Sequence, residues 1–232
     1  TTTAWYLKAM LDAWMHEEHR PETGLLSTIR NYDGNEWSDA VMTTPEPGEL
    51  HEFLARTVKN RLPYTTMEVS SQALKYKRVR ELRFQVGIFL NISEDHISPQ
   101  EHEDFEDYFS AKLSMFRQCD TACVNLDSDH AQRILKAARK AGHVVTFGRH
   151  PHADLRCSNI RTGENGTSFT VSCATFTESF TLAMKGRFNI ENAMAAIAAA
   201  YVYGVPVQCM KQALAQTRVP GRMETFASRD GK

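Results

Sequence analysis

The chain has 232 residues, of which 42% are hydrophobic and 24% are charged, and its net charge at neutral pH is −1. A chain of this length buries about 70% of its unfolded surface, which is enough for one large domain or two small ones. The sequence has no basic excess that would attract nucleic acid or anionic lipid. It has no apolar stretch near the roughly 20 residues of a membrane span, and it does not begin with the basic residues typical of a signal peptide. We therefore expect a cytoplasmic protein without nucleic-acid or membrane partners.

Candidate helices alternate with short β-rich runs over residues 1–149. Apolar spacing predicts helices over residues 3–17, 47–60, 103–117 and 128–141. Runs of β-branched and aromatic residues predict strands over residues 24–29, 64–69, 86–90, 122–125 and 143–147. This alternation predicts an α/β fold with a mainly parallel sheet flanked by helices. The run 86–90 is apolar throughout, so we expect it to be buried on both faces.

The pattern changes over residues 154–185. Residues 155–161, 167–173 and 179–184 are short alternating runs, and Gly163-Glu-Asn-Gly166 predicts a turn between the first two. We expect a small antiparallel appendage there. The closing part, residues 186–232, begins with a helix over residues 190–203 that ends at Gly204, and a second helix over residues 207–216 follows.

Polar side chains stand where two of the predicted strands end. Asn91-Ile-Ser-Glu-Asp-His96 directly follows one strand, and Glu68 lies near the end of another. Open α/β sheets bind their ligands at this edge. Oxygen and imidazole donors gathered there favour a hard metal ion with a phosphate substrate.

A series of motifs runs along the chain in a fixed order: Glu68-Val-Ser-Ser71, Asn91-Ile-Ser-Glu-Asp-His96, Tyr108-Phe-Ser-Ala-Lys112, Gly186-Arg-Phe-Asn-Ile-Glu-Asn192 and Val219-Pro-Gly-Arg-Met-Glu224. In this order they resemble the central domain of the Mur ligases, and the resemblance covers essentially the whole chain. Thr43-Thr-Pro45 and Lys77-Arg-Val79 resemble the members that add the third amino acid to UDP-N-acetylmuramoyl-L-alanyl-D-glutamate. The resemblance implies a P-loop NTPase-like domain that uses ATP and Mg²⁺ to form an amide through an acyl phosphate in peptidoglycan precursor synthesis.

The same resemblance implies roles for individual residues on the nucleotide side. Thr1 would hold a nucleotide-bound Mg²⁺, and Thr2 would touch the phosphates. Glu68 and His96 would ligate Mg²⁺. The residues that would contact the rest of the nucleotide are Asn189 and Asn192, at the adenine, and Arg222.

On the acceptor side, the residues that would hold the muramoyl peptide are Thr43, Thr44, Ser70 and Arg78. Lys112 would lie beside the metal and act in catalysis as a carbamate. Helical spacing places Tyr108 and Lys112 on one face. A bare ammonium would repel Mg²⁺, whereas a lysine with a lowered pKa can react with carbon dioxide and become an anionic oxygen donor. The alternative is an ion pair with Glu106 or Asp107.

Some expected family features do not occur in this sequence. Family members place Gly-Thr-Asn-Gly-Lys directly before the threonines that open this chain, and they carry an N-terminal uridine-nucleotide domain and a C-terminal amino-acid-binding domain. We therefore expect a central-domain fragment that is inactive by itself and works with those missing domains. Gln72 stands where many relatives have histidine, and the segment 95–112 is slightly longer than usual.

Each assignment has a structural alternative. Glu68 could be a solvated carboxylate, and His96 a structural histidine. Arg78 could belong to a solvated basic face, and Asn189 is the natural N-cap of the following helix. Zinc could bind near two candidate sets, His150-Pro-His152 with Cys157 or Cys119 with Cys123, but neither forms a paired Cys-x-x-Cys set. The odd number of cysteines, five, instead indicates free thiols in a reducing compartment.

Three other functions stay open. The first is a related ATP-dependent amide ligase of the folylpolyglutamate or cyanophycin synthetase type, from which Thr43, Thr44 and Arg78 would discriminate. The others are a non-catalytic nucleotide-binding module and a folded fragment without useful ligand affinity. Within the favoured function, the added amino acid is lysine or diaminopimelate.

Overall fold

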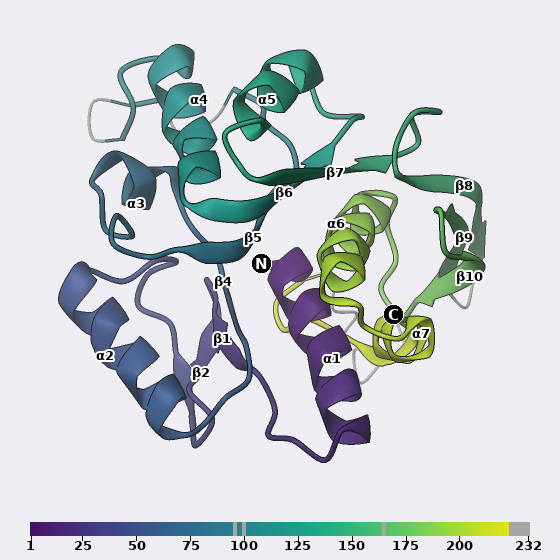
Figure 1. Cartoon of the computed structure of the whole chain (residues 1–232), viewed down its shortest axis with the longest axis horizontal. Helices are drawn as coiled ribbons and strands as arrows, with labels where there is room; N and C mark the ends of the chain where they lie inside the picture. Colours follow the sequence, from purple (N-terminus) through teal and green to yellow (C-terminus); the bar gives the residue numbers. More distant parts are fainter. Residues whose placement is uncertain (95–96, 99–100, 164–165, 223–232) are drawn as a thin grey trace, which may run out of the picture.

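The computed structural model describes residues 1–94, 97–98, 101–163 and 166–222, and it arranges them as helices around two sheets (Figure 1). The larger, six-stranded sheet has the order β10-β9-β8-β7-β6-β5. Its strands are β5 (Phe84–Phe89), β6 (Cys119–Asn125), β7 (His143–Gly148), β8 (Leu155–Gly163), β9 (Gly166–Ser172) and β10 (Thr177–Leu182).

Strands β5 to β8 pair in parallel, and β8 to β10 pair antiparallel. The predicted α/β fold with a mainly parallel sheet is therefore confirmed. The antiparallel strands extend this same sheet, because Phe147 of β7 pairs with Leu155 of β8. Gly163 pairs with Gly166, which agrees with the predicted turn.

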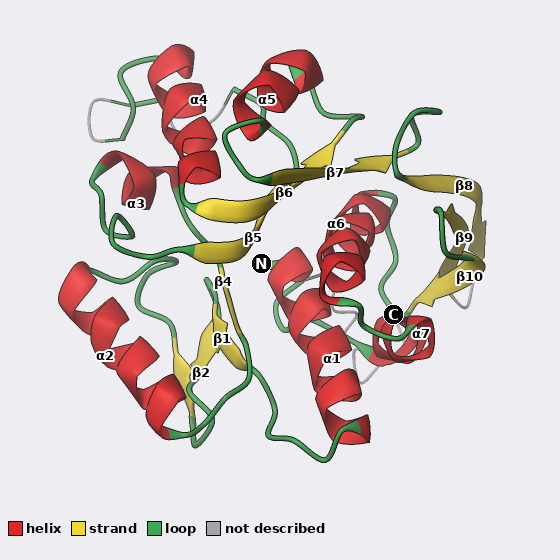
Figure 2. Cartoon of the chain, in the orientation of Figure 1, coloured by secondary structure: helices red, strands yellow, loops and turns green. Residues whose placement is uncertain are grey.

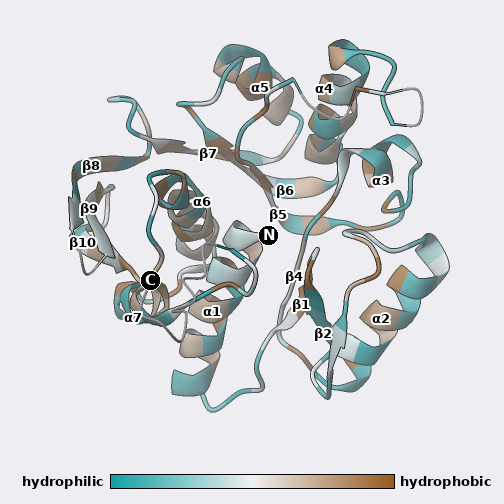
Figure 3. Cartoon of the chain, turned by 180° about the vertical axis from the view of Figure 1, so that it is seen from behind, coloured by the Kyte–Doolittle hydropathy of each residue, from teal (hydrophilic) through white to brown (hydrophobic). Residues whose placement is uncertain are grey.

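Helices cover both faces of the larger sheet (Figure 2). On one face lie α1 (Thr2–Glu17), α6 (Phe188–Tyr203) and α7 (Val207–Gln216), which share the main hydrophobic core with β6 to β10. On the other face lie α4 (Phe105–Leu113), the short 3₁₀ helix η1 (Ser114–Arg117) and α5 (Ala131–Ala138). The hydrophobic segments of β6 and β7 run between these layers (Figure 3). No described helix is both long and apolar enough to cross a membrane.

The smaller sheet has the order β3-β2-β1-β4. It consists of β1 (Gly24–Leu26), β2 (Arg30–Tyr32), β3 (Trp37–Asp39) and β4 (Thr65–Met67), and it packs with α2 (Pro47–Lys59) and α3 (Ser71–Lys75). Strands β1 and β4 are parallel, as the βα alternation predicts. The hairpin of β2 and β3 was not predicted from the sequence; in it, Asp33 accepts hydrogen bonds from the amides of Asn35 and Glu36.

A cavity of about 540 Å³ lies between the two sheets, bordered by β4, β5 and α1. Strands β4 and β5 are each the last strand of their own sheet on this side. Val86 and Ile88 of β5 line the cavity and are only half-buried. The expectation that the run 86–90 is buried on both faces is therefore wrong, because one face of this strand borders an open space.

Candidate functional site

Glu68, directly after β4, is the centre of a hydrogen-bond network. Its Oε2 accepts from the hydroxyl of Thr1 at 3.1 Å and from that of Thr28 at 3.1 Å. Its Oε1 accepts from the amide of Thr28 at 2.9 Å, and the Thr28 hydroxyl lies 3.2 Å from that of Thr43. The Glu68 side chain is only 16% exposed. A fully solvated carboxylate is therefore the wrong description of this residue.

Thr44 connects the backbone of Glu68 to α3. Its hydroxyl donates to the carbonyl of Glu68 at 2.9 Å and accepts from the amide of Ser70 at 3.0 Å. The Ser70 hydroxyl in turn accepts from the amide of Ala73 at 3.1 Å and caps α3. These contacts bring the predicted acceptor-side residues Thr43, Thr44 and Ser70 next to Glu68.

Arg78, three residues after the end of α3, contacts the same group of residues. Its Nη1 donates to the carbonyl of Thr44 at 3.2 Å, and its Nη2 lies 2.7 Å from Oε1 of Glu46. The side chain is 17% exposed, whereas that of Arg80 is 70% exposed. The Arg78 Nε is buried and has no hydrogen-bond partner among the described residues. Arg78 thus does not belong to a solvated basic face.

The nucleotide-side residues lie where α1 meets α6. Thr3 donates to Oδ1 of Asn192 at 3.1 Å, and Asn192 donates to Oδ1 of Asn189 at 3.3 Å. Arg222 lies 3.4 Å from the hydroxyl of Thr1, and Thr2 is buried in the first turn of α1.

The expected N-cap role of Asn189 is wrong. Helix α6 begins at Phe188, so Asn189 lies inside the helix, and its fully buried amide donates to the carbonyl of Lys185 at 2.7 Å. The amide group therefore fixes the preceding turn and orients Asn192.

Lys112 lies in α4, with its Nζ 3.2 Å from the hydroxyl of Tyr108, so the predicted shared helical face is confirmed. The ammonium also stands over the ring of Phe89, at 5.6 Å from the centroid. The carboxylate of Glu106 binds Arg133 at 2.6 Å, and that of Asp107 binds Lys75 at 2.6 Å. His96, the other predicted metal ligand, lies outside the described residues.

Glu68 and Thr1 provide a carboxylate and a hydroxyl on one side, and this donor set suits a hard divalent cation such as Mg²⁺. Within residues 1–94, 97–98, 101–163 and 166–222, no group of three or more His, Cys, Asp or Glu side chains could hold a metal. All the cysteines are free thiols. Burial raises the pKa of Cys119 to about 11 and that of Cys123 to about 12, which disfavours the thiolate that zinc requires.

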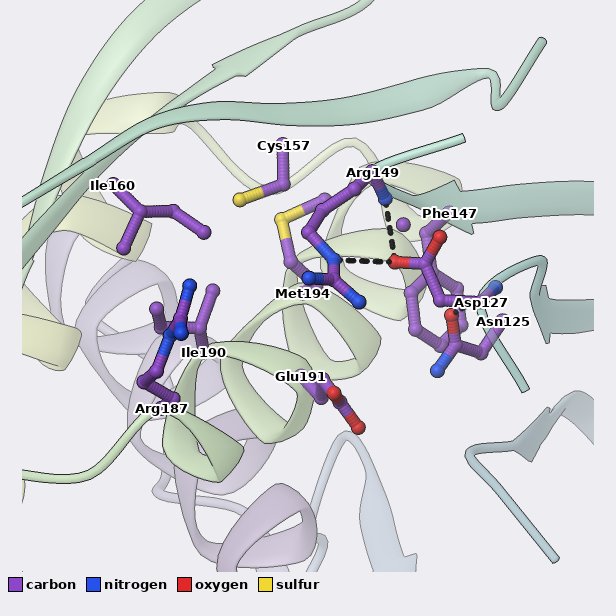
Figure 4. Close-up of a pocket in the computed structure, with 11 residues that line it drawn as sticks. Asn125, Asp127, Phe147, Arg149, Cys157, Ile160, Arg187, Ile190, Glu191 and Met194 are labelled. Atoms are coloured by element: carbon purple, nitrogen blue, oxygen red, sulfur yellow. Dashed lines mark hydrogen bonds and ion pairs between the residues drawn. The ribbon is translucent and has the colours of Figure 1, made fainter. Parts of the chain in front are cut away.

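A second, smaller cavity of about 40 Å³ lies at the carboxyl ends of β6 and β7, against the first turns of α6 (Figure 4). Asp127 accepts hydrogen bonds there from the amide and Nε of Arg149, at 2.7 and 3.2 Å. Ile190, Glu191 and Met194 of α6 face this cavity. None of these residues was predicted as a site residue, although Asp127 lies two residues after the predicted strand 122–125, close to the position that Asn91 has after the strand 86–90.

Comparisons with known proteins give matches over most of the chain. Residues 1–200 match the family model described as the Mur ligase middle domain. The UDP-N-acetylmuramoyl-L-alanyl-D-glutamate–2,6-diaminopimelate ligase of Clostridium perfringens is 36% identical over 230 residues, which cover 98% of this chain and 46% of the relative. The corresponding L-lysine ligase of Streptococcus agalactiae is 37% identical over 232 residues, 100% of this chain and 45% of the relative.

A solved structure of a UDP-N-acetylmuramoyl-L-alanyl-D-glutamate–2,6-diaminopimelate ligase has the same fold. It superposes with a TM-score of 0.80 at 20% identity, covering 98% of this chain and 47% of that one. The chain therefore spans about half the length of the relatives that it matches.

Proposed function

The chain belongs to the Mur ligase family, and on this premise we propose that it is the central ATP-binding domain of a longer amide ligase. The ligase would add lysine or diaminopimelate to UDP-N-acetylmuramoyl-L-alanyl-D-glutamate in peptidoglycan precursor synthesis. Support comes from relatives of both specificities, at 36% and 37% identity. The amino-acid substrate would be bound by further domains of the same protein.

The observation that carries this proposal is the position of Glu68 between two groups of residues. Its carboxylate contacts the nucleotide-side Thr1, and its backbone carbonyl accepts from the acceptor-side Thr44. Phosphoryl transfer from ATP to a carboxylate requires both substrates to be held close together, with the attacking oxygen in line with the γ-phosphorus and the leaving oxygen. A network that joins the two groups through one residue provides such an arrangement.

The proposed reaction has two steps. An oxygen of the acceptor carboxylate attacks the γ-phosphorus of ATP, so that an acyl phosphate forms and ADP leaves. The amine of the third amino acid then attacks the acyl carbon, and inorganic phosphate leaves from the tetrahedral intermediate. Bound Mg²⁺ supplies charge neutralisation at the phosphates.

The chain's own residues would bind and orient the substrates for these steps. Thr1 and Glu68 would hold Mg²⁺. Asn192, oriented by Asn189, would contact the adenine, and Arg222 the nucleotide. On the other side, the guanidinium of Arg78 would bind the carboxylate end of the muramoyl peptide beside Thr43, Thr44 and Ser70.

The test is a ligation assay on the full-length protein that contains this chain. It is incubated with UDP-N-acetylmuramoyl-L-alanyl-D-glutamate, ATP, Mg²⁺ and either lysine or diaminopimelate. We expect ADP release that depends on the amino acid, and a tripeptide product of matching mass. ATP-dependent glutamylation of a folate or elongation of an aspartate–arginine polymer, without tripeptide, would assign a related ligase instead. Nucleotide binding without any product would indicate a non-catalytic module.

A further inference from the structure

His102 is completely buried between α3 and α4, and it has no role in the function proposed above. Its Nδ1 lies 2.9 Å from Oδ2 of Asp107, and its Nε2 lies 3.0 Å from the hydroxyl of Ser71. A carboxylate only accepts hydrogen bonds. With the proton on Nδ1, the neutral ring donates to Asp107 and accepts from Ser71, so both nitrogens are satisfied.

Lys75 makes a second contact between α3 and the same carboxylate, so that Ser71, His102, Asp107 and Lys75 form a cluster of contacts. Its ammonium lies 2.6 Å from the same oxygen of Asp107 and donates to the carbonyl of Glu101 at 3.0 Å. Ser71 and Lys75 are the first and last residues of α3, and Asp107 lies in the first turn of α4. Both ends of α3 are thus attached to α4 through one carboxylate.

This cluster of contacts lies between two sets of proposed site residues. On the α3 side, Ser70 directly precedes Ser71 and binds Thr44. On the α4 side, the imidazole of His102 packs on the ring of Tyr108 with 5.2 Å between centroids, and Tyr108 accepts a hydrogen bond from Lys112. A displacement of His102 would therefore disturb both Ser70 and Lys112.

We propose that His102 is a positioning residue of the ligase, one that holds α3 and α4 in register and so fixes the separation of Ser70 and Lys112. This inference rests on the proposed function, because the separation of Ser70 and Lys112 would set the distance between the acceptor carboxylate and the bound Mg²⁺. His102 itself does not touch the substrates. One rigid ring with partners on opposite sides suits this task, because it fixes both helices at once.

The first experiment measures steady-state kinetics of the full-length protein with His102→Phe and His102→Asn. Phenylalanine keeps the volume and loses both hydrogen bonds. We expect kcat to fall by about 10- to 100-fold, as for groups that orient a reactive site, with the KM for ATP changed less than about twofold. Asparagine can still donate to Asp107 and should recover part of kcat.

A matched control separates positioning from stability. Thr57→Val removes a hydrogen bond of another buried residue, from the Thr57 hydroxyl to the carbonyl of Leu54 at 2.8 Å, in α2. We expect it to lower the melting temperature without lowering kcat. If His102→Phe behaves like this control, or raises both substrate constants equally, His102 is merely structural and the proposal is overturned.

The second experiment uses the 232-residue chain and does not depend on ligase activity. In His102→Phe, amide hydrogen exchange should accelerate in residues 71–75 and 105–113 and stay unchanged in α6. Unchanged exchange in both helices would overturn the inference. If the wild-type full-length protein forms no ligated product, the proposed function fails, and the exchange result still decides whether His102 couples α3 to α4.

Discussion

The guanidinium of Arg78 points inward from a segment in which Lys77 and Arg80 are exposed. Its contacts with Thr44 and Glu46 hold it beside the proposed acceptor site. An arginine guanidinium can bind a carboxylate through parallel hydrogen bonds. This orientation makes Arg78 the residue whose loss should affect one substrate and spare the other.

We predict that Arg78→Ala in the full-length protein raises the KM for the muramoyl peptide by the equivalent of about 1.5 to 3 kcal/mol, the usual value of a hydrogen bond to a charged group. The KM for ATP should hardly change. Arg80→Ala is the control, because Arg80 lies on the same segment with a 70% exposed side chain. Equal weakening of both substrates would mean that Arg78 is structural.

Lys112 gives a second prediction at this scale. If it works as a carbamate, Lys112→Ala in the full-length protein should lose most activity, and added small carboxylates should restore part of it because they replace an oxygen donor. Lys112→Arg should stay inactive although it keeps the charge, since a guanidinium forms no carbamate. The same assays check both variants. Full activity of the arginine variant would rule the carbamate out.

At the scale of the elements, local sequence signals predicted the long helices well and the short elements poorly. Helices α2 and α7 have clear apolar periods, whereas α6 is rich in alanine and buried on nearly all sides. Gly204 in the left-handed region ends α6 as expected. Strands β2 and β3 have three residues each, too few to show alternation, although Asp33-Gly34 is a turn signal. Helix α3 has only five residues, too few to show a helical period.

The candidate site was predictable in composition but not in its contacts. The family resemblance named Thr1, Glu68 and Arg78, and the structure connects them through hydrogen bonds that pass by way of Thr44. The resemblance did not identify Thr28, which binds Glu68 across 40 positions in sequence, or His102, which binds Ser71 across 31. Periodicity describes neighbours within one element, and these contacts depend on how separate elements pack.

The link between α3 and α4 should depend on pH through Asp107. The ammonium of Lys75, together with His102, lowers the pKa of Asp107 from 3.8 to about 2. A carboxyl whose pKa is lowered by folding adds stability that is complete above its unfolded value and is lost as pH falls through its folded value. Asp107→Asn should therefore lower the melting temperature at pH 7, and the difference should vanish as the pH approaches 2.

Thermal melts between pH 7 and pH 2 would check this prediction. Asp129→Asn is the control, because Asp129 is exposed in the loop before α5, and it should follow the wild type throughout. A difference between Asp107→Asn and the wild type that is independent of pH would show that the effect comes from packing and not from charge.

At the scale of the whole molecule, we expect the 232-residue chain to fold by itself but not to catalyse ligation by itself. The main core joins α1, α6 and α7 to the larger sheet, so the 232-residue chain has a sizeable core of its own. We predict a cooperative melt of this chain with negligible ATP-dependent tripeptide formation, because the amino-acid substrate would be bound by other domains. Calorimetry and the ligation assay test the two parts. Robust tripeptide formation by the chain alone would contradict the prediction.

The smaller sheet is joined to this core partly through one buried cation. Lys8 of α1, 6% exposed, donates to Oδ2 of Asp12 and to the carbonyl of Thr23, both at 2.7 Å. Its ammonium also lies 4.8 Å from the ring centre of Tyr32 on β2. A cavity lies between β4 and β5, and the other contacts across this boundary include the stacking of Trp5 on Trp37 and of Trp14 on Tyr64, at 5.5 and 6.1 Å between ring centroids. Strands β2 and β3 of the smaller sheet are only half-buried or exposed, and such regions open at lower free energy than a buried core.

We therefore predict that amide exchange in residues 24–39 is faster than in the alanine-rich part of α6, and that Lys8→Met accelerates it there by about tenfold or more, since charge-assisted hydrogen bonds are lost. Lys211→Met is the control, because the Lys211–Glu178 pair is surface-exposed at 33% and 43% and should contribute little. Exchange followed by mass spectrometry resolves the two regions. If Lys8→Met accelerated exchange equally in residues 24–39 and in α6, the smaller sheet and the main core would open as one unit, and the division inferred from the Lys8 contacts and the cavity would be wrong.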